Sequence, residues 1–285
     1  MIAFWPYVLS SILMIAMPLL LGWWIARTRH ASWRLFLIGM VTFIGSQLLH
    51  IPFNWLVLQR LQLLPTDTST LSNLIILALF LGFSAGVFEE GARYLAYRFW
   101  ATDARSWGAG LMLGAGHGGV ESIVVGLSVG VNAVALGAIS QGGLQGLVPA
   151  EQMSLVNDQI AAMLAAPLSL IMLGPLERAF AISAHLALSL LVMQVFVRRQ
   201  IGWLFLAILW HALLDAVAVF SVATWSPYIT EALVGVIALL SVGIIFWLRT
   251  PEPVEPELEP LPPAEPVLPQ SGPVSSESLE KSKYS

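Results

Sequence analysis

The sequence predicts an all-α protein: a polytopic transmembrane helical bundle of about seven to nine spans, followed by a disordered C-terminal tail. Of its 285 residues, 57% are hydrophobic and only 11% are charged, whereas an ordinary soluble domain is about 25% charged. The apolar residues gather in long stretches, and a helix needs ~20 mostly apolar residues to cross a bilayer. A bilayer can cover this much apolar surface, and a soluble core cannot.

Seven stretches are long and apolar enough to be spans. The first has no basic segment before it, and Arg27 and Arg29 follow it, so we interpret it as an uncleaved span and not a signal peptide. Residues 128–173 are apolar but interrupted by glycine and proline. They could form an extracytoplasmic loop, a re-entrant hairpin or two further short spans. The predicted spans are 4–26, 33–53, 74–100, 107–127, 176–197, 201–221 and 229–248.

Composition divides the chain into two parts. Residues 1–250 contain every predicted span and form the transmembrane helical domain. Residues 251–285 are rich in proline and glutamate and have no hydrophobic period, which predicts a disordered cytoplasmic tail. Much of the acid that makes the net charge −4 lies in this tail, so the charge gives no reason to expect nucleic acid as a partner. The chain has no cysteine, which excludes disulfides and thiolate metal ligands.

Ionisable residues within predicted spans are the candidate functional residues. A charge near the middle of a bilayer is costly, and such residues are therefore rare and commonly functional. Four groups occur in this chain: Glu89-Glu90 with Arg93, His117 with Glu121, Glu177-Arg178 with His185, and His211 with Asp215.

The first group pairs two carboxylates with one arginine. Glu89 is four residues before Arg93 and Glu90 is three before it, so either carboxylate can reach the guanidinium on one helix face. Arg93 can neutralise one carboxylate and leave the other to act as a general base. An ion pair that only makes burial tolerable would need a single glutamate.

The second group lies in a glycine-rich helix. His117 and Glu121 are four residues apart, and a carboxylate beside an imidazole can fix its tautomer. The alternative is a simple helix–helix hydrogen bond. Gly110, Gly114 and Gly118 also recur every four residues. Such a face indicates close helix packing, and it would also let an extended peptide approach the backbone.

The last two groups have helical spacings as well. Arg178 and His185 are seven residues apart and lie on one face. Glu177 follows Pro175, where an acid could equally serve the helix dipole. His211 and Asp215 are four residues apart and share a face.

Estimated depth connects the four groups. At 1.5 Å per residue from the nearest predicted cytoplasmic arginine, His117, His185 and His211 lie ~18–20 Å deep, and Glu90 ~12–22 Å. In a core ~30 Å thick these residues are level, which predicts one shared site. By contrast, we expect His50, next to Pro52, to face the outer interface.

These motifs resemble those of the YhfC-type intramembrane proteases, within the wider superfamily of type II CAAX prenyl endopeptidases, CPBP/Abi proteins and PrsW-type proteases. The resemblance covers about residues 85–220, and the Glu177-Arg178…His185 element resembles the YhfC group particularly. The spacing from the glutamate pair to Arg93 is one residue shorter than in the CAAX pattern and closer to that of PrsW. The motifs are Glu89-Glu90-Gly91-Ala92-Arg93, His117-Gly118-Gly119-Val120-Glu121 and His211-Ala212-Leu213-Leu214-Asp215.

The resemblance implies an intramembrane endopeptidase that hydrolyses membrane or membrane-associated peptides, with membrane lipid as its surroundings. In a glutamic-type mechanism, one of Glu89 and Glu90 would activate water with a histidine, and no cofactor is expected. Another histidine and Asp215 would hold the substrate carbonyl and its oxyanion.

Zinc is the alternative cofactor. His117, His185 and His211 with a carboxylate could bind zinc and leave a position for water. We rank this second, because the chain has no His-Glu-x-x-His motif.

Two non-protease functions also fit buried charges. A transporter usually shows inverted repeats and interrupted helices in matched positions, and the sequence shows only one interrupted region. A non-catalytic scaffold could keep intramembrane histidines without cleaving anything. The full set of acids and bases favours an enzyme.

Arginines predict how the chain lies in the cell membrane. They gather in alternate loops, which the positive-inside rule assigns to the cytoplasm, with the N-terminus outside and the C-terminus in the cytoplasm. A reporter active only in the cytoplasm should therefore be active when fused after Ser285 and silent when fused after Leu64. A stably expressed but silent fusion at Ser285 would contradict this orientation. The arginines in question are Arg27, Arg29, Arg34, Arg98, Arg105, Arg198, Arg199 and Arg249.

Overall fold

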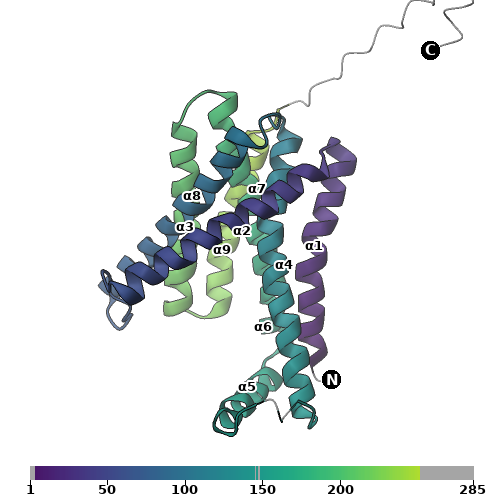
Figure 1. Cartoon of the computed structure of the whole chain (residues 1–285), viewed down its shortest axis with the longest axis vertical. Helices are drawn as coiled ribbons and strands as arrows, with labels where there is room; N and C mark the ends of the chain where they lie inside the picture. Colours follow the sequence, from purple (N-terminus) through teal and green to yellow (C-terminus); the bar gives the residue numbers. More distant parts are fainter. Residues whose placement is uncertain (1–3, 145, 147, 251–285) are drawn as a thin grey trace, which may run out of the picture. The chain divides into compact units, whose positions relative to one another are not determined.

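The computed structural model describes residues 4–144, 146 and 148–250, and this part of the chain is all-α (Figure 1). The prediction for the tail at 251–285 concerns residues outside this set. The helices are α1 (Trp5–Arg29), α2 (Trp33–Trp55), α3 (Leu71–Phe99), α4 (Trp107–Ser140), α5 (Met153–Ala165), α6 (Leu168–Ile171), α7 (Leu173–Val197), α8 (Gly202–Thr224) and α9 (Pro227–Trp247), with short turns η2 (Leu56–Arg60) and η4 (Ala150–Gln152).

Within the described residues, seven helices are long and apolar enough to cross a membrane, which confirms the predicted polytopic bundle. Serine and threonine side chains mark the beginnings of several of them by accepting a backbone N–H of the first turn, as N-caps do. These caps are Ser32 on α2, Thr70 on α3, Ser106 on α4 and Ser226 on α9.

The interrupted region at 128–173 is partly a continuation of α4. This helix runs to Ser140, beyond the predicted end at 127. The glycines in the extension do not break it, and two of them pack against the N-terminal part of the chain: Gly130 faces Ser11 of α1, and Gly137 faces Phe4 just before α1. The rest of the region forms η4, α5 and α6, and α5, with 13 residues, is too short to span a bilayer.

The α7 helix lies at the centre of the bundle. In its most apolar window 67% of the residues are buried, against 28% to 39% for the other six spans. It contacts α1, α3, α4, α8 and α9. Polar side chains on α7 therefore face other helices and not lipid, and they need partners within the protein.

Glycines bring α2 and α4 into backbone contact. In Figure 1, α2 runs obliquely across α4. A Cβ atom added to Gly116 would lie 2.0 Å from the carbonyl oxygen of Phe36, and one added to Gly39 would lie 2.2 Å from that of Leu113. Small residues on both sides thus allow a crossing that a methyl group would prevent.

At two other interfaces a glycine also lies directly against a backbone carbonyl of the neighbouring helix. A Cβ on Gly82 of α3 would lie 2.4 Å from the carbonyl oxygen of Ala212 on α8, and one on Gly114 of α4 would lie 2.8 Å from that of His185 on α7. The predicted close packing of the Gly110, Gly114 and Gly118 face is therefore confirmed. The suggestion that a peptide could approach this face is wrong, because α7 covers it.

The Gly116 contact predicts a stability effect. Changing Gly116→Ala should lower the thermal unfolding midpoint in detergent and cost roughly 1–3 kcal/mol, because two backbones must separate. Gly45→Ala is the control, since a Cβ atom there meets nothing within 4 Å and alanine favours a helix. Equal midpoints for the two variants would contradict the proposed tightness of this crossing.

Candidate active site

The eight predicted site residues come together in one network, contributed by α3, α4, α7 and α8. The ring centroid of His185 lies 5.2 Å from that of His117 and 5.6 Å from that of His211. The side chains of the three histidines are at most 5% exposed. The common depth estimated from the sequence therefore corresponds to direct proximity in the structure.

Arg93 neutralises Glu90 and not Glu89. Both side chains are fully buried, and the guanidinium forms an ion pair with Glu90 Oε2. The other oxygen, Oε1, lies 2.8 Å from Nδ1 of His211. A carboxylate paired with arginine is an acceptor, so Nδ1 of His211 carries a proton, and in the neutral ring the lone pair is on Nε2.

Glu89 is the second carboxylate, and it faces imidazoles. Its Oε2 lies 3.1 Å from Nε2 of His117 and 3.8 Å from Nε2 of His211. Its Oε1 accepts a 2.8 Å hydrogen bond from the amide of Gln47 on α2. One oxygen of Glu89 is therefore occupied by a neutral donor, and the other is directed toward the histidines.

Glu121 does not pair with His117, contrary to the expectation from their spacing. It accepts hydrogen bonds from Arg178 at 2.6 Å and from Nε2 of His185 at 2.8 Å, both on α7. His117 instead contacts Glu89 on α3 and Thr42 on α2. The i,i+4 spacing considers only residues of the same helix. It could not reveal that His117 finds its partners on α2 and α3.

His185 and Arg178 are neighbours on α7, as their spacing predicted, and both bind Glu121. Because Glu121 is an acceptor, Nε2 of His185 carries the proton, and Nδ1 accepts from Nη2 of Arg93 at 3.2 Å. Arg178 also bonds Glu177 at 2.5 Å. The Glu177 side chain is 43% exposed, so it lies at the edge of the network.

A polar cavity adjoins this network. It has a volume of about 90 Å³, and carboxylate, guanidinium and imidazole groups line much of it. Asp215 is part of its wall, 36% exposed, with Oδ2 3.6 Å from Nε2 of His211. A cavity with such walls can hold water in a membrane protein. Its charged and imidazole-bearing residues are Glu89, Glu121, Glu177, Arg178, His185, His211 and Asp215.

The sequence analysis missed the contribution of α2. Thr42 lies 3.0 Å from Nδ1 of His117, and Gln47 bonds Glu89. His50, expected at the outer interface, is half-buried and contacts Gln47 and Asn54 on α2 and Ser84 on α3. The sequence feature that could have revealed this contribution is a set of three polar residues at helical spacing in an apolar segment: Gln47, His50 and Asn54.

Comparisons with known proteins identify the family of this chain. A family model described as "YhfC intramembrane metalloprotease" matches residues 13–238. The chain belongs to the YhfC family. The "Uncharacterized membrane protein YhfC" of Bacillus subtilis (strain 168) is 33% identical over 251 residues, which cover 84% of this chain and 93% of that protein. No solved structure matches the chain.

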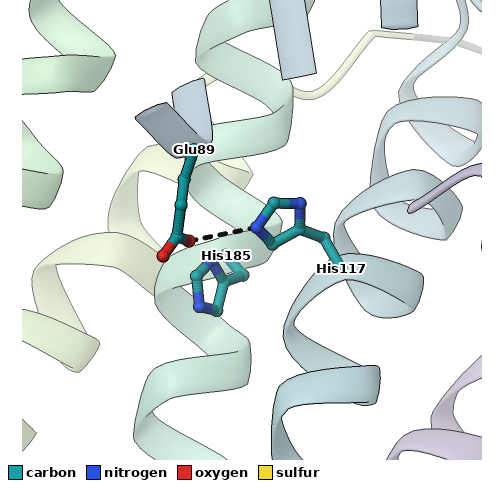
Figure 2. Close-up of side chains that lie close together, drawn as sticks. All are labelled: Glu89, His117 and His185. Atoms are coloured by element: carbon teal, nitrogen blue, oxygen red, sulfur yellow. Dashed lines mark hydrogen bonds and ion pairs between the residues drawn. The ribbon is translucent and has the colours of Figure 1, made fainter. Parts of the chain in front are cut away.

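The family description implies a metal, and one group of side chains in the described part of the chain fits it. Glu89, His117 and His185 are all buried, and each offers a ligand atom within 4.8 Å of the others (Figure 2). Two imidazoles and one carboxylate are a known catalytic zinc set. It differs from the predicted set of three histidines and a carboxylate, because His211 is not part of the group.

The outer contacts of this group also suit a metal. Histidines that bind metal usually hold a protein partner with the other ring nitrogen. Here His117 holds Thr42 with Nδ1, and His185 holds Glu121 with Nε2. His117 thus offers Nε2 and His185 offers Nδ1, although Arg93 would have to release the latter atom.

The buried Glu90–Arg93 pair predicts a large effect on stability. Arg93→Met should destabilise the protein by roughly 3–5 kcal/mol, because it leaves a buried carboxylate unpaired. The double variant Arg93→Met/Glu90→Gln should recover most of this loss. The surface pair Arg34–Asp103, whose side chains are 46% and 68% exposed, is the control. There Arg34→Met should cost ~0–1 kcal/mol, and equal losses in denaturation experiments would count against the assigned pairing.

Proposed function

We propose that this protein is a metal-dependent intramembrane endopeptidase that hydrolyses peptide bonds of membrane-embedded or membrane-associated substrates. The observation that carries the proposal is the buried Glu89, His117 and His185 group, with its outer partners, beside a polar cavity. The family description supports the same activity. Kinship with the CAAX and PrsW proteases is part of the proposal and rests on the shared motifs.

The charge of the network supports a bound cation. Five carboxylates and two guanidiniums meet there, so three negative charges are uncompensated while the imidazoles are neutral. Excess charge is costly within a bilayer. A divalent cation held by Glu89, His117 and His185 would offset two of these charges.

Glu89, His117 and His185 would hold the ion and leave one position open, as catalytic zinc sites do. What zinc supplies when bound is polarisation of the peptide carbonyl and a more acidic water. Thr42 and Glu121 keep the two rings in their required tautomers. Arg178 holds Glu121 in place from the rim of the cavity.

His211 is the proposed general base. Glu90 orients it through Nδ1, and its Nε2 faces the cavity. It would accept a proton from water as the water oxygen bonds to the carbonyl carbon. The same proton would pass to the amide nitrogen as the C–N bond breaks, which yields a carboxyl group and an amine.

Asp215 supports this transfer from the wall of the cavity. Its Oδ2 lies 3.6 Å from Nε2 of His211, a distance at which a carboxylate stabilises an imidazolium and at which one water can be shared. This role replaces the expected one of holding the substrate oxyanion.

A glutamic-type mechanism is the second candidate, and the contact between Glu89 and His117 favours it. The 3.1 Å separation of Oε2 and Nε2 allows the two groups to share one proton and activate water without a metal. In that case chelation would leave cleavage unchanged.

The proposal predicts separable losses in detergent-purified protein. The protein should contain about one zinc per chain and cleave a transmembrane peptide, and a chelator should stop cleavage until zinc is restored. His117→Ala should lose both zinc and cleavage. His211→Gln should keep zinc yet cleave roughly 10²–10⁴-fold more slowly, because it lacks only the base.

His30→Gln is the matched control, because His30 lies in an exposed loop and its replacement should change neither property. Full cleavage by zinc-free protein would overturn the metal and favour the glutamic mechanism. A folded protein without zinc or cleavage would favour a scaffold or transporter.

A further inference from the structure

We infer that α2, which carries none of the predicted site residues, positions the two central groups of the site through Thr42 and Gln47. This inference deepens the proposed function and rests on it, since it assigns positioning residues to Glu89 and His117. Thr42 and Gln47 would act through these groups and not on the substrate itself.

Thr42 determines the tautomer of His117. Its hydroxyl lies 2.6 Å from the carbonyl oxygen of Gly39 and 3.0 Å from Nδ1 of His117. A hydroxyl has one proton, and a carbonyl can only accept it. Thr42 therefore donates to Gly39 and accepts from Nδ1–H, which leaves the lone pair of His117 on Nε2, facing Glu89.

Gln47 determines which oxygen of Glu89 is available. An amide NH2 group can only donate and a carboxylate oxygen can only accept, so Gln47 donates to Oε1 of Glu89 at 2.8 Å. The amide oxygen of Gln47 lies 3.4 Å from Nδ1 of His50, and Nε2 of His50 contacts Asn54 and the Ser84 hydroxyl. With Oε1 occupied by Gln47, Oε2 of Glu89 is the oxygen that faces His117.

The contacts of Thr42 with His117 and of Gln47 with Glu89 together produce a site that needs a proton or a cation. The lone pair of His117 Nε2 faces Glu89 Oε2 at 3.1 Å. Two acceptors at this distance repel unless a proton or a metal ion is shared between them. By fixing both orientations, α2 prepares the pair for a cation before any cation binds.

The α2 helix is well placed to do this. The crossing of Gly39 with Gly116 holds it against α4 one turn before Thr42 and one residue before His117. Further along α2, the ring of His50 stacks on that of Phe88, the residue before Glu89 on α3, with centroids 5.5 Å apart. Small lateral shifts of α2 are therefore restrained near both Thr42 and Gln47.

The test combines a zinc measurement with a spectroscopic one. Thr42→Val removes the hydroxyl while keeping the shape, and it should weaken zinc binding by ~10–100-fold in a chelator competition, as loss of outer partners does. Thr42→Ser should restore it. Gln47→Leu should weaken binding to a similar degree.

Nitrogen-15 NMR of the histidine rings reads the tautomer without depending on zinc or cleavage. His117, identified by its absence in His117→Ala, should carry its proton on Nδ1. Thr42→Val should remove this preference, and Thr42→Ser should keep it.

Thr230→Val is the matched control. Thr230 and Thr42 are each 7% exposed, but the hydroxyl of Thr230 has no hydrogen-bond partner. Its loss should change neither zinc affinity nor the His117 signal. An unchanged tautomer in a folded Thr42→Val variant, or a His117 ring with a proton on Nε2 and none on Nδ1 in the original protein, would overturn the inference. Absence of zinc and cleavage in the original protein would instead overturn the proposed function.

Discussion

Compensation of buried and partly buried carboxylates is the constraint on which this structure depends. Glu89, Glu90 and Glu121 lie among seven helices that are long and apolar enough to cross a membrane, where lipid offers neither water nor counter-ions. Each must therefore find donors on another part of the protein. Glu90 finds Arg93 and His211, and Glu121 finds Arg178 and His185. These contacts join α3 to α8 and α4 to α7, so the same interactions that make burial tolerable also hold the bundle together.

Glycine makes such short polar contacts possible between helices. Helices with ordinary side chains pack 8–10 Å apart, and a glycine at the contact lets backbones approach more closely. The crossings at Gly116, Gly82 and Gly114 occur beside His117, Ala212 and His185, respectively. Packing and site are therefore not separate features here, because the glycines set the distances at which the ionisable side chains meet.

The side chains of the network are oriented in advance, as they are in catalytic sites. The imidazoles of His117, His185 and His211 each hold one partner outside the centre, respectively Thr42, Glu121 and Glu90. The second nitrogen of His117 and His211 faces carboxylates, and that of His185 accepts from Arg93. Fixing ring orientation in advance lowers the cost of reorganisation when charge develops. The five carboxylates in excess of two arginines also favour a cation or a proton at the centre. Metal-dependent and glutamic mechanisms would use the same arrangement of side chains. They differ in whether a metal ion or a proton lies beside Glu89.

The sequence by itself determined the helical membrane fold, most span positions and the residues of the network. Runs of apolar residues and isolated charges can be recognised in the sequence alone. Isolated charges are informative because burying a charge in a bilayer is costly. Only the tertiary structure decided the pairing. His117 meets Glu89 and not Glu121, α4 extends past 127, and Thr42 and Gln47 belong to the site. Residues such as threonine and glutamine carry no charge to mark them, and the partner of a buried side chain depends on which helices cross, which spacing within one helix cannot specify.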